Sequence, residues 1–210
     1  YVRSFSSGPS LGGLSLGVYF ASKFLAMCGF GKILVEGVGA GHLDVKPLLY
    51  SHTRVVVLTP ASGDVVQMIK SGIMELGDMY VINKGDIADP HQVRVHIEEV
   101  MRLRRAKGGW EYPVIVTEAI NRKGLGDLAK AIEDHAAHLR KSGELERRNR
   151  VMRLTELKDV VSSYVNEILD EVIGEETLEP LSRFLDRRST SLEVVPSILY
   201  EVVRRVRSHE

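Results

Sequence analysis

Short apolar runs alternate with helical patterns over residues 14–141, and this alternation constrains the fold more than any other feature. The runs that predict strands lie at 32–36, 54–59, 79–82 and 113–117. The predicted helices lie at 14–29, 64–74, 90–106 and 125–141. Apolar strands that are separated by helices form parallel sheets covered on both faces. The sequence therefore predicts an α/β fold with a mostly parallel sheet and helices on both faces.

The character of the chain changes after residue 142, beyond which no strand is predicted. A helix is expected over 145–173 because apolar residues recur there at intervals of three and four, namely Leu154, Leu157, Val161, Tyr164 and Ile168. Two more helices are expected at 176–186 and 192–206. We therefore expect a domain at 1–142 and a helical extension at 143–210, which either packs back on the sheet or dimerises.

The charge balance and the cysteine usage exclude several classes of partner. Lys+Arg and Asp+Glu both number 28, so nothing indicates binding to nucleic acid or to an anionic membrane. No apolar run is long enough to cross a membrane. The single cysteine, Cys28, allows no disulfide within the chain and indicates a reduced, cytoplasmic setting. We expect Cys28 to be a small core residue.

We expect the histidines and basic residues of the later predicted helices to face solvent rather than to form a metal or nucleic-acid site. His135 and His138 lie three residues apart on a predicted helix, but no third metal ligand is suggested, so we expect a solvent-facing pair. The basic residues within 140–153 are interleaved with Glu144 and Glu146. Because few aromatic residues lie nearby, a solvated helix face is favoured over a nucleic-acid site.

The most informative local motif is Asn83-Lys84-Gly85-Asp86, which directly follows a predicted strand. A carboxylate at Asp86 can accept hydrogen bonds from both the N1–H and the N2 amino group of guanine, which adenine does not offer. The stem of Lys84 can lie over the base, and Asn83 can tie the loop to a neighbouring turn. A polar turn after a strand is the simpler alternative. The position after a buried strand favours guanine recognition.

A second acidic group, Glu36, ends a predicted strand and opens an E-x-x-G pattern. Its carboxylate can hold a water bound to Mg²⁺, while the glycine leaves its N–H free to approach a γ-phosphate. A strand-end acid before a flexible turn is the alternative. Farther along, Asp64, Gln67 and Lys70 recur every three residues, a spacing that by itself favours a solvated helix face.

No phosphate-binding loop of the form G-x-x-x-x-G-K-[ST] occurs in the 210 residues. The segment 29–32 resembles the end of such a loop, but Ile33 replaces the required hydroxyl and the segment leads into a predicted strand. The chain also begins at Tyr1 in what reads as mid-domain sequence. We therefore expect the N-terminal part that carries this loop to be missing.

Taken together, these segments resemble the MeaB/ArgK family of GTPases, the chaperones of methylmalonyl-CoA mutase, which are also called lysine/arginine/ornithine (LAO/AO) transport ATPases. The resemblance rests on 11–15, 35–42, 63–75 and 82–86, whose order and spacing match. It covers 1–140 well and the helical tail loosely. The pattern G-D-x-x-Q-x-x-K-x-G-I-x-E at 63–75 is far more specific than a general GTPase motif.

The resemblance implies a P-loop NTPase-like fold and Mg²⁺-dependent hydrolysis of GTP to GDP. Predicted catalytic residues are Glu36, near Mg²⁺ and the γ-phosphate, and Asp64 and Lys70, in a segment that relays the nucleotide state. The predicted nucleotide-binding residues are Asn83, Lys84, Gly85, Asp86, Glu118, Ala119 and Ile120. The implied partners are an adenosylcobalamin-dependent methylmalonyl-CoA mutase and a second copy of the chain, with the helical tail as the dimerisation arm.

Three positions depart from the family pattern, which usually has Thr at Gly37, Gln at His42 and Ser at Glu118. Two alternatives stay open beside the GTPase hypothesis. One is a dimerising regulatory module that acts without nucleotide. The other is a related GTPase metallochaperone, against which the lack of a Cys/His cluster argues. Without a phosphate-binding loop, we expect this chain alone to bind GTP very weakly and not to hydrolyse it measurably.

Overall fold

The computed structural model describes residues 1–5, 16–37, 46–60, 72–103 and 109–172, together with residues 200 and 203. The chain forms two compact units, Tyr1–Arg153 and Leu154–Glu210, and each is described by itself. The predicted helices at 176–186 and 192–206 fall outside the described residues, apart from helical residues 200 and 203.

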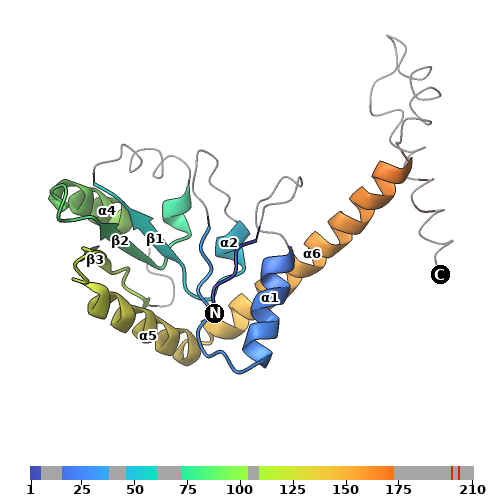
Figure 1. The fold of residues 1–210 in the computed structure, drawn as a ribbon, viewed down its shortest axis with the longest axis horizontal. Helices are drawn as coiled ribbons and strands as arrows, with labels where there is room; N and C mark the ends of the chain where they lie inside the picture. The colour runs from blue at the N-terminus through green and yellow to red at the C-terminus, as the bar shows by residue number, and fades with distance from the viewer. Residues whose placement is uncertain are drawn as a thin grey trace, which may run out of the picture. The chain divides into compact units, whose positions relative to one another are not determined.

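The first unit is built on a parallel sheet of three strands in the order β1-β2-β3 (Figure 1). The strands are β1 (Val55–Leu58), β2 (Met79–Asn83) and β3 (Val114–Thr117). In the pairing of β2 with β3, Asn83 lies opposite Thr117. The carboxyl ends of these strands therefore meet at one edge, and the predicted parallel α/β fold is confirmed.

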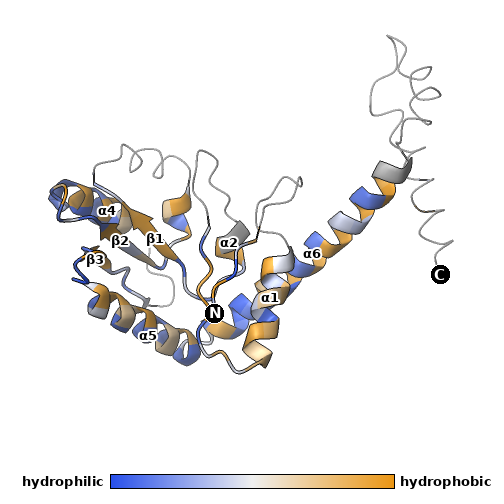
Figure 2. Ribbon diagram, in the orientation of Figure 1, coloured by the Kyte–Doolittle hydropathy of each residue, from blue (hydrophilic) through white to orange (hydrophobic). Residues whose placement is uncertain are grey.

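Helices flank the sheet, with α4 (His91–Leu103) on one side and α5 (Leu125–Lys141) on the other (Figure 1). Two shorter segments precede them, α2 (Lys46–Leu49) before β1 and the 3-10 turn η1 (Ile73–Glu75) before β2. In Figure 2 the strands are hydrophobic, whereas α4 and α5 carry both hydrophobic and hydrophilic residues. This difference is expected for a sheet buried between amphipathic helices.

The core lies around the central strand β2, in which Met79 to Ile82 are at most 2% exposed. Tyr80 and Ile82 share one face of β2 and belong to a buried cluster that includes Leu58 of β1 and Ile97 of α4. The Tyr80 hydroxyl donates a hydrogen bond to the Met74 carbonyl oxygen, so the buried phenol is satisfied. This hydrogen bond fixes the start of β2 against η1.

Two predictions at the start of the chain are wrong. Residues 32–36 form no strand, and the Leu34 side chain is 90% exposed. A strand needs a hydrogen-bonding neighbour, and this run pairs with no strand of the described sheet. Cys28 is exposed rather than in the core because it directly follows α1 (Leu16–Met27) in the turn at Gly29.

The predicted helix at 64–74 lies outside the described residues up to Ser71. Its last three positions are not a continuation of an α-helix. Gly72 has a φ of 74°, which no α-helix contains, and η1 begins at the next residue. Asp64 and Lys70, two of the predicted catalytic residues, both fall outside the described part of the chain.

The long helix α6 (Glu144–Val172) begins in the first unit and continues into the second. Within the second unit, the side chains of Leu154, Leu157, Val161 and Tyr164 are 44–59% exposed, while Ile168 is buried. None of the helices in the described ranges combines the length and apolarity that a membrane crossing requires.

Candidate functional site

Two loops meet at the carboxyl edge of the sheet, where β2 ends at Asn83 and β3 ends at Thr117. The Asn83 Oδ1 atom accepts a hydrogen bond from the Thr117 hydroxyl at 3.0 Å and another from the Ala119 N–H at 3.2 Å. The Gly85 N–H donates to the Thr117 carbonyl oxygen at 3.2 Å. These three bonds hold the predicted base-binding segments, 83–86 and 118–120, side by side.

The loop after β2 turns sharply so that it can lie against β3. Lys84 has a φ of 62°, in the left-handed region, and the Ile87 N–H donates to the Lys84 carbonyl oxygen at 3.0 Å. A Cβ atom at Gly85 would lie 2.9 Å from Val116 Cγ1, so only glycine fits without a shift. Lys84 and Asp86 are exposed on either side of this anchored glycine. Their charged groups are therefore accessible to a ligand.

The loop after β3 binds its own acidic side chain. The Glu118 carboxylate accepts a hydrogen bond from Asn121 at 3.0 Å and lies 2.9 Å from Lys123 Nζ. The hydrogen bonds from Lys123 and then from Asn121 lower the pKa of Glu118. A two-residue backbone bridge between Glu118 and Lys123 closes the loop. Ile120, at its tip, is 87% exposed.

Three residues that shape this edge were missed at the level of sequence. Thr117 was interpreted only as the end of a strand, and Lys123 and Gly124 were not singled out. Gly124 has a φ of 72°, and a Cβ atom there would lie 2.2 Å from the Val116 carbonyl oxygen. A glycine just before a predicted helix was the available signal.

Glu36 is not joined to these two loops. It is exposed in the stretch 31–37, and in the described part of the chain it forms no hydrogen bond or ion pair with 83–86 or 118–120. The stretch is joined instead to α5, because Lys32 Nζ lies 2.6 Å from a Glu133 carboxylate oxygen. The structure thus brings together seven of the predicted site residues, Asn83 to Asp86 and Glu118 to Ile120, but not Glu36.

The residues present fit a guanine base better than they fit a metal ion. An exposed carboxylate at Asp86, the stem of Lys84 and the apolar side chain of Ile120 are the groups that a purine edge and its two faces need. For Mg²⁺ the described ranges contain no group of three or more His, Cys, Asp or Glu side chains that could bind it. Glu36 alone does not define a metal site.

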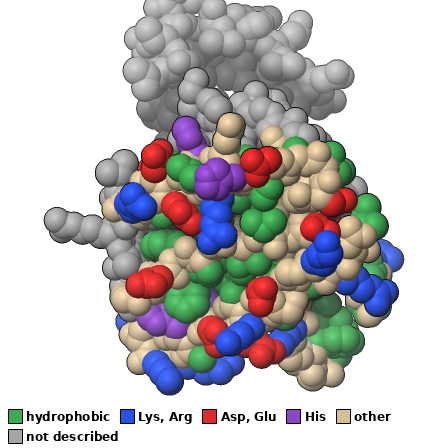
Figure 3. All heavy atoms as spheres, turned by 90° about the vertical axis from the view of Figure 1, so that its left-hand side faces the viewer, with side chains coloured by type: hydrophobic (Ala, Val, Ile, Leu, Met, Phe, Trp, Pro, Cys, Tyr) green, Lys and Arg blue, Asp and Glu red, His purple; other side chains and the backbone are tan. Residues whose placement is uncertain are grey.

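The surface drawn in Figure 3 shows cationic and anionic side chains interspersed among hydrophobic ones. No extended patch of one sign covers the described residues on this face. Such a mixed surface differs from the basic stripe typical of nucleic-acid binding and agrees with the zero net charge.

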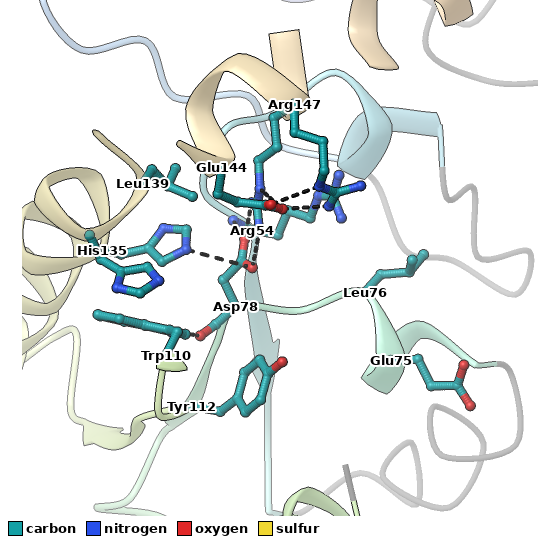
Figure 4. Close-up of a pocket in the computed structure, with 12 residues that line it drawn as sticks. Arg54, Glu75, Leu76, Asp78, Trp110, Tyr112, His135, Leu139, Glu144 and Arg147 are labelled. Atoms are coloured by element: carbon teal, nitrogen blue, oxygen red, sulfur yellow. Dashed lines mark hydrogen bonds and ion pairs between the residues drawn. The ribbon is translucent and has the colours of Figure 1, made fainter. Parts of the chain in front are cut away.

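A second group of charged residues lies at the opposite, amino edge of the sheet (Figure 4). Asp78, just before β2, is 4% exposed and accepts two hydrogen bonds of 2.7 Å from the Arg148 guanidinium. The backbone N–H of Arg54 donates a hydrogen bond to the same carboxylate at 2.9 Å. Because every oxygen of Asp78 has a donor, its burial as a carboxylate is compensated.

His135 belongs to this amino-edge group, so the prediction of a solvent-facing histidine pair is wrong. Its side chain is 1% exposed, its Nδ1 lies 2.9 Å from the Thr53 hydroxyl, and its Nε2 lies 3.7 Å from Asp78. Burial lowers the pKa of His135 to about 4, against the opposing attraction of Asp78. The ring is neutral at physiological pH.

The predicted solvated face of 140–153 is also wrong at one position. The Arg148 side chain is only 11% exposed, because the start of α6 packs over the amino ends of the strands and directs this guanidinium onto Asp78. Arg140, Arg147 and Arg150 are exposed, as predicted. Interleaved charges indicate an exposed face only where no buried partner is within reach.

Comparison with known proteins shows to which family this chain is similar. The family model described as "Methylmalonyl Co-A mutase-associated GTPase MeaB" matches residues 1–175. A relative from Pyrococcus abyssi that carries a GTPase name is 31% identical over 207 residues, which are 97% of this chain and 64% of the relative. A Caenorhabditis elegans protein named methylmalonic aciduria type A homolog, mitochondrial, is 24% identical and matches 98% of this chain and 52% of its own length.

A solved structure gives the same result for the fold. The crystal structure of an LAO/AO transport system kinase superposes with a TM-score of 0.60 at 22% identity, covering 91% of this chain and 63% of that one. The chain spans less than two thirds of the length of each of these relatives. With the family model matched over most of its residues, the chain belongs to the MeaB family of methylmalonyl-CoA mutase-associated GTPases.

Proposed function

We propose that the carboxyl edge of the sheet is the guanine-binding part of a GTPase that regulates cofactor loading or protection of an adenosylcobalamin-dependent methylmalonyl-CoA mutase. The observation that carries the proposal is the double hydrogen bond to Asn83 Oδ1. It joins the two loops, so the Asp86 carboxylate, the Lys84 stem and Ile120 belong to one surface. Family membership supports the nucleotide and the partner.

In this proposal each side chain has a separate task. Asp86 accepts the N1–H and the N2 amino group of guanine, which selects guanine over adenine. Lys84 and Ile120 cover the two faces of the base. Asn83 acts as a positioning residue, because its amide oxygen is already used in holding the second loop. Glu118, which is held by Lys123 and Asn121, keeps its charge away from the base.

Hydrolysis of GTP would also require Mg²⁺ and a phosphate-binding loop beside this base site. Mg²⁺ would neutralise the charge that develops on the phosphates, and Glu36, Asp64 and Lys70 remain the proposed catalytic and relay residues. We also propose a cytoplasmic location, although the Caenorhabditis elegans relative is named as mitochondrial.

Replacing Asp86 tests the base site directly. Asp86→Asn should move the preference of the chain from GDP to xanthosine diphosphate, because xanthine offers a carbonyl where guanine offers an amino group. Asp86→Ala should cost about 1.5–3 kcal/mol of guanine binding, the scale of a hydrogen bond to a charged group. NMR titration of the labelled chain detects weak binding and should show shifts confined to 83–86 and 118–120.

The matched control is Asp134→Asn, which removes an exposed carboxylate from α5 without touching the loops. It should bind both nucleotides as the unmodified chain does. Equal binding of GDP and xanthosine diphosphate by the Asp86→Asn variant would remove this surface from the nucleotide site.

We further propose that 143–210 is a dimerisation arm. The exposed stripe of Leu154, Leu157, Val161 and Tyr164 in α6 supports this, because a second copy of the same stripe would cover it. This stripe also favours a second candidate function, a dimerising module that acts without nucleotide. Binding of the chain to a cobalamin-dependent mutase, measured with and without GTP, separates the two functions, since only a nucleotide-gated regulator changes its affinity.

A further inference from the structure

A small cavity of about 70 Å³ lies at the amino edge of the sheet, on the opposite edge from the proposed guanine site. We call it the amino-edge pocket. Its charged residues include Arg54, Asp78, Glu144, Arg147 and Arg148, and its wall includes Trp110 (Figure 4). All of these residues belong to the first unit. Nothing in the proposed GTPase chemistry uses this pocket.

Two carboxylates in the pocket already have guanidinium partners. Asp78 is held by both terminal nitrogens of Arg148 at 2.7 Å. Glu144 accepts a hydrogen bond of 2.7 Å from Arg147 Nε, and a terminal nitrogen of Arg147 donates to its other oxygen. Each pair is neutral. Neither carboxylate therefore has a full charge left to balance a third cation.

Arg54 is that third cation. Its Nε atom is buried and has no hydrogen-bond partner in the described part of the chain. Burial, followed by the repulsion of Arg148, lowers the pKa of Arg54 despite the nearby Asp78. A buried donor without an acceptor is unfavourable. Because Arg54 lines the cavity and is only partly buried, the rest of its guanidinium can meet an incoming oxygen atom.

The remaining titratable groups do not supply the missing negative charge. Glu75 also lines the cavity, but it is exposed and its carboxylate points away from the arginines (Figure 4). His135 is neutral because burial holds its pKa at about 4. His138 lines the wall, with its ring centre 5.3 Å from that of Trp110. The cluster of three guanidiniums and two paired carboxylates is therefore left with one positive charge.

We propose that the amino-edge pocket binds one carboxylate group through the guanidinium of Arg54, with Arg147 at its mouth. A carboxylate carries the single negative charge that the cluster lacks, and its planar shape matches the guanidinium fork. The cavity holds only a few water molecules, by the usual allowance of about 10–15 Å³ each, so a nucleotide does not fit. The rings of Trp110 and His138 provide an apolar wall for the carbon attached to the carboxylate.

The chain contains one tryptophan, which makes Trp110 a specific reporter. Its Nε1–H donates to the Asp78 carbonyl oxygen at 2.9 Å, so its indole NMR signal senses the pocket floor. Titration with sodium acetate, against sodium chloride at the same ionic strength, should shift this signal in a saturable way. Arg54→Gln should weaken the acetate affinity by about tenfold or more, since a charge-assisted fork is lost.

Two further variants provide a second test of the pocket, in case Arg54→Gln does not fold, and a matched control. Arg147→Gln changes a half-exposed side chain, so it should fold even if Arg54→Gln does not, and it should also weaken acetate binding. Arg150→Gln, which is exposed on the same helix, is the matched control and should bind acetate normally. A shift with chloride equal to that with acetate, or unchanged acetate affinity in Arg147→Gln and Arg54→Gln, would overturn the proposal. So would tighter binding of phosphate than of acetate.

The source of the carboxylate can be settled with a second probe. N-acetyl-aspartate amide presents a carboxylate as an acidic protein side chain does, with its backbone charges removed. Binding as tight as that of acetate would identify a protein side chain as an admissible occupant, whereas binding of acetate alone would identify a free small carboxylate. GDP binding to the Arg54→Gln variant should be unchanged, which separates this proposal from the guanine site.

Discussion

Single residues carry much of the geometry at the carboxyl edge. Asn83 uses one amide oxygen to hold two donors, one at the end of β3 and one in the loop after it, and Gly124 allows that loop to return against β3. Neither task leaves a periodic signal in the sequence. The four-residue motif is predicted from its guanine-binding chemistry and its place after an apolar strand. Its partners Thr117 and Lys123 depend on strand order, which single-sequence patterns do not specify.

Replacement of Gly124 should be among the most damaging single changes in the first unit. Its φ of 72° and the 2.2 Å approach of an added Cβ to the Val116 carbonyl oxygen leave no room for a methyl group. We expect Gly124→Ala to lower the free energy of unfolding by about 2 kcal/mol or more, through backbone strain and a steric clash. Urea unfolding followed by circular dichroism measures the change.

Gly126 offers a matched control two residues away. It lies in α5, and an added Cβ would meet nothing within 4 Å. Gly126→Ala should therefore leave the stability unchanged or raise it by up to about 1 kcal/mol, because alanine favours helices. Equal destabilisation by both variants would contradict the steric explanation.

His135 should make the stability depend on pH. Its pKa of about 4 in the folded chain lies below the ordinary 6.5, so the unfolded chain binds the proton more tightly. The contribution of His135 is complete above pH 6.5 and is lost as the pH falls from 6.5 towards 4. We expect a loss of at most about 3 kcal/mol over this window, at 1.36 kcal/mol per pKa unit.

Urea unfolding at several pH values tests this expectation. His135→Gln should flatten the pH dependence between 6.5 and 4, whereas His96→Gln, an exposed change on α4, should keep it. A slope that survives in His135→Gln would show that another group titrates. The position of His135 could not be foreseen from spacing, since its burial follows from contacts with Thr53, Asp78 and Trp110, which are distant in sequence.

At the scale of elements, the hydrophobic periodicity of the sequence predicted a helix and three strands correctly. It failed for one strand, because a strand also needs a neighbouring strand to pair with. The helix predicted at 125–141 is α5, and three of the four predicted strands are β1, β2 and β3. The failed strand, 32–36, is equally apolar, but strands require a partner that the sequence pattern cannot guarantee. A helix makes its own backbone hydrogen bonds and needs no such neighbour, so the pattern at 125–141 was sufficient to predict α5.

The α6 stripe should govern self-association. Leu157→Glu combined with Val161→Glu places two carboxylates in the exposed stripe, which should weaken a dimer by repulsion and by the loss of apolar contact. Sedimentation equilibrium should then report a monomer where the unmodified chain forms a dimer. Ser163→Glu, exposed on the same helix and outside the stripe, should leave the association unchanged. A monomeric unmodified chain would end the proposal of a dimerisation arm.

At the scale of the whole molecule, we predict that this chain recognises the guanine base but does not hydrolyse GTP. The carboxyl edge supplies groups for guanine, whereas the sequence has no G-x-x-x-x-G-K-[ST] loop to hold the phosphates. We expect the 210-residue chain to release no measurable phosphate from GTP with Mg²⁺. A chain extended at its N-terminus by such a loop should hydrolyse GTP in the same assay. Hydrolysis by the present chain at a normal rate would show that the phosphate site lies within it.

Strand β2 connects the two charged edges of the first unit over a fixed interval. Asp78 immediately precedes β2 and Asn83 ends it, so the two residues are separated by roughly 17 Å at about 3.3 Å per residue. Adding or removing one residue within β2 would turn its following side chains to the wrong face and misplace one anchor relative to the other. Insertions in related chains should therefore fall in the connecting loops, and the five-residue step from this aspartate to this asparagine should keep its length.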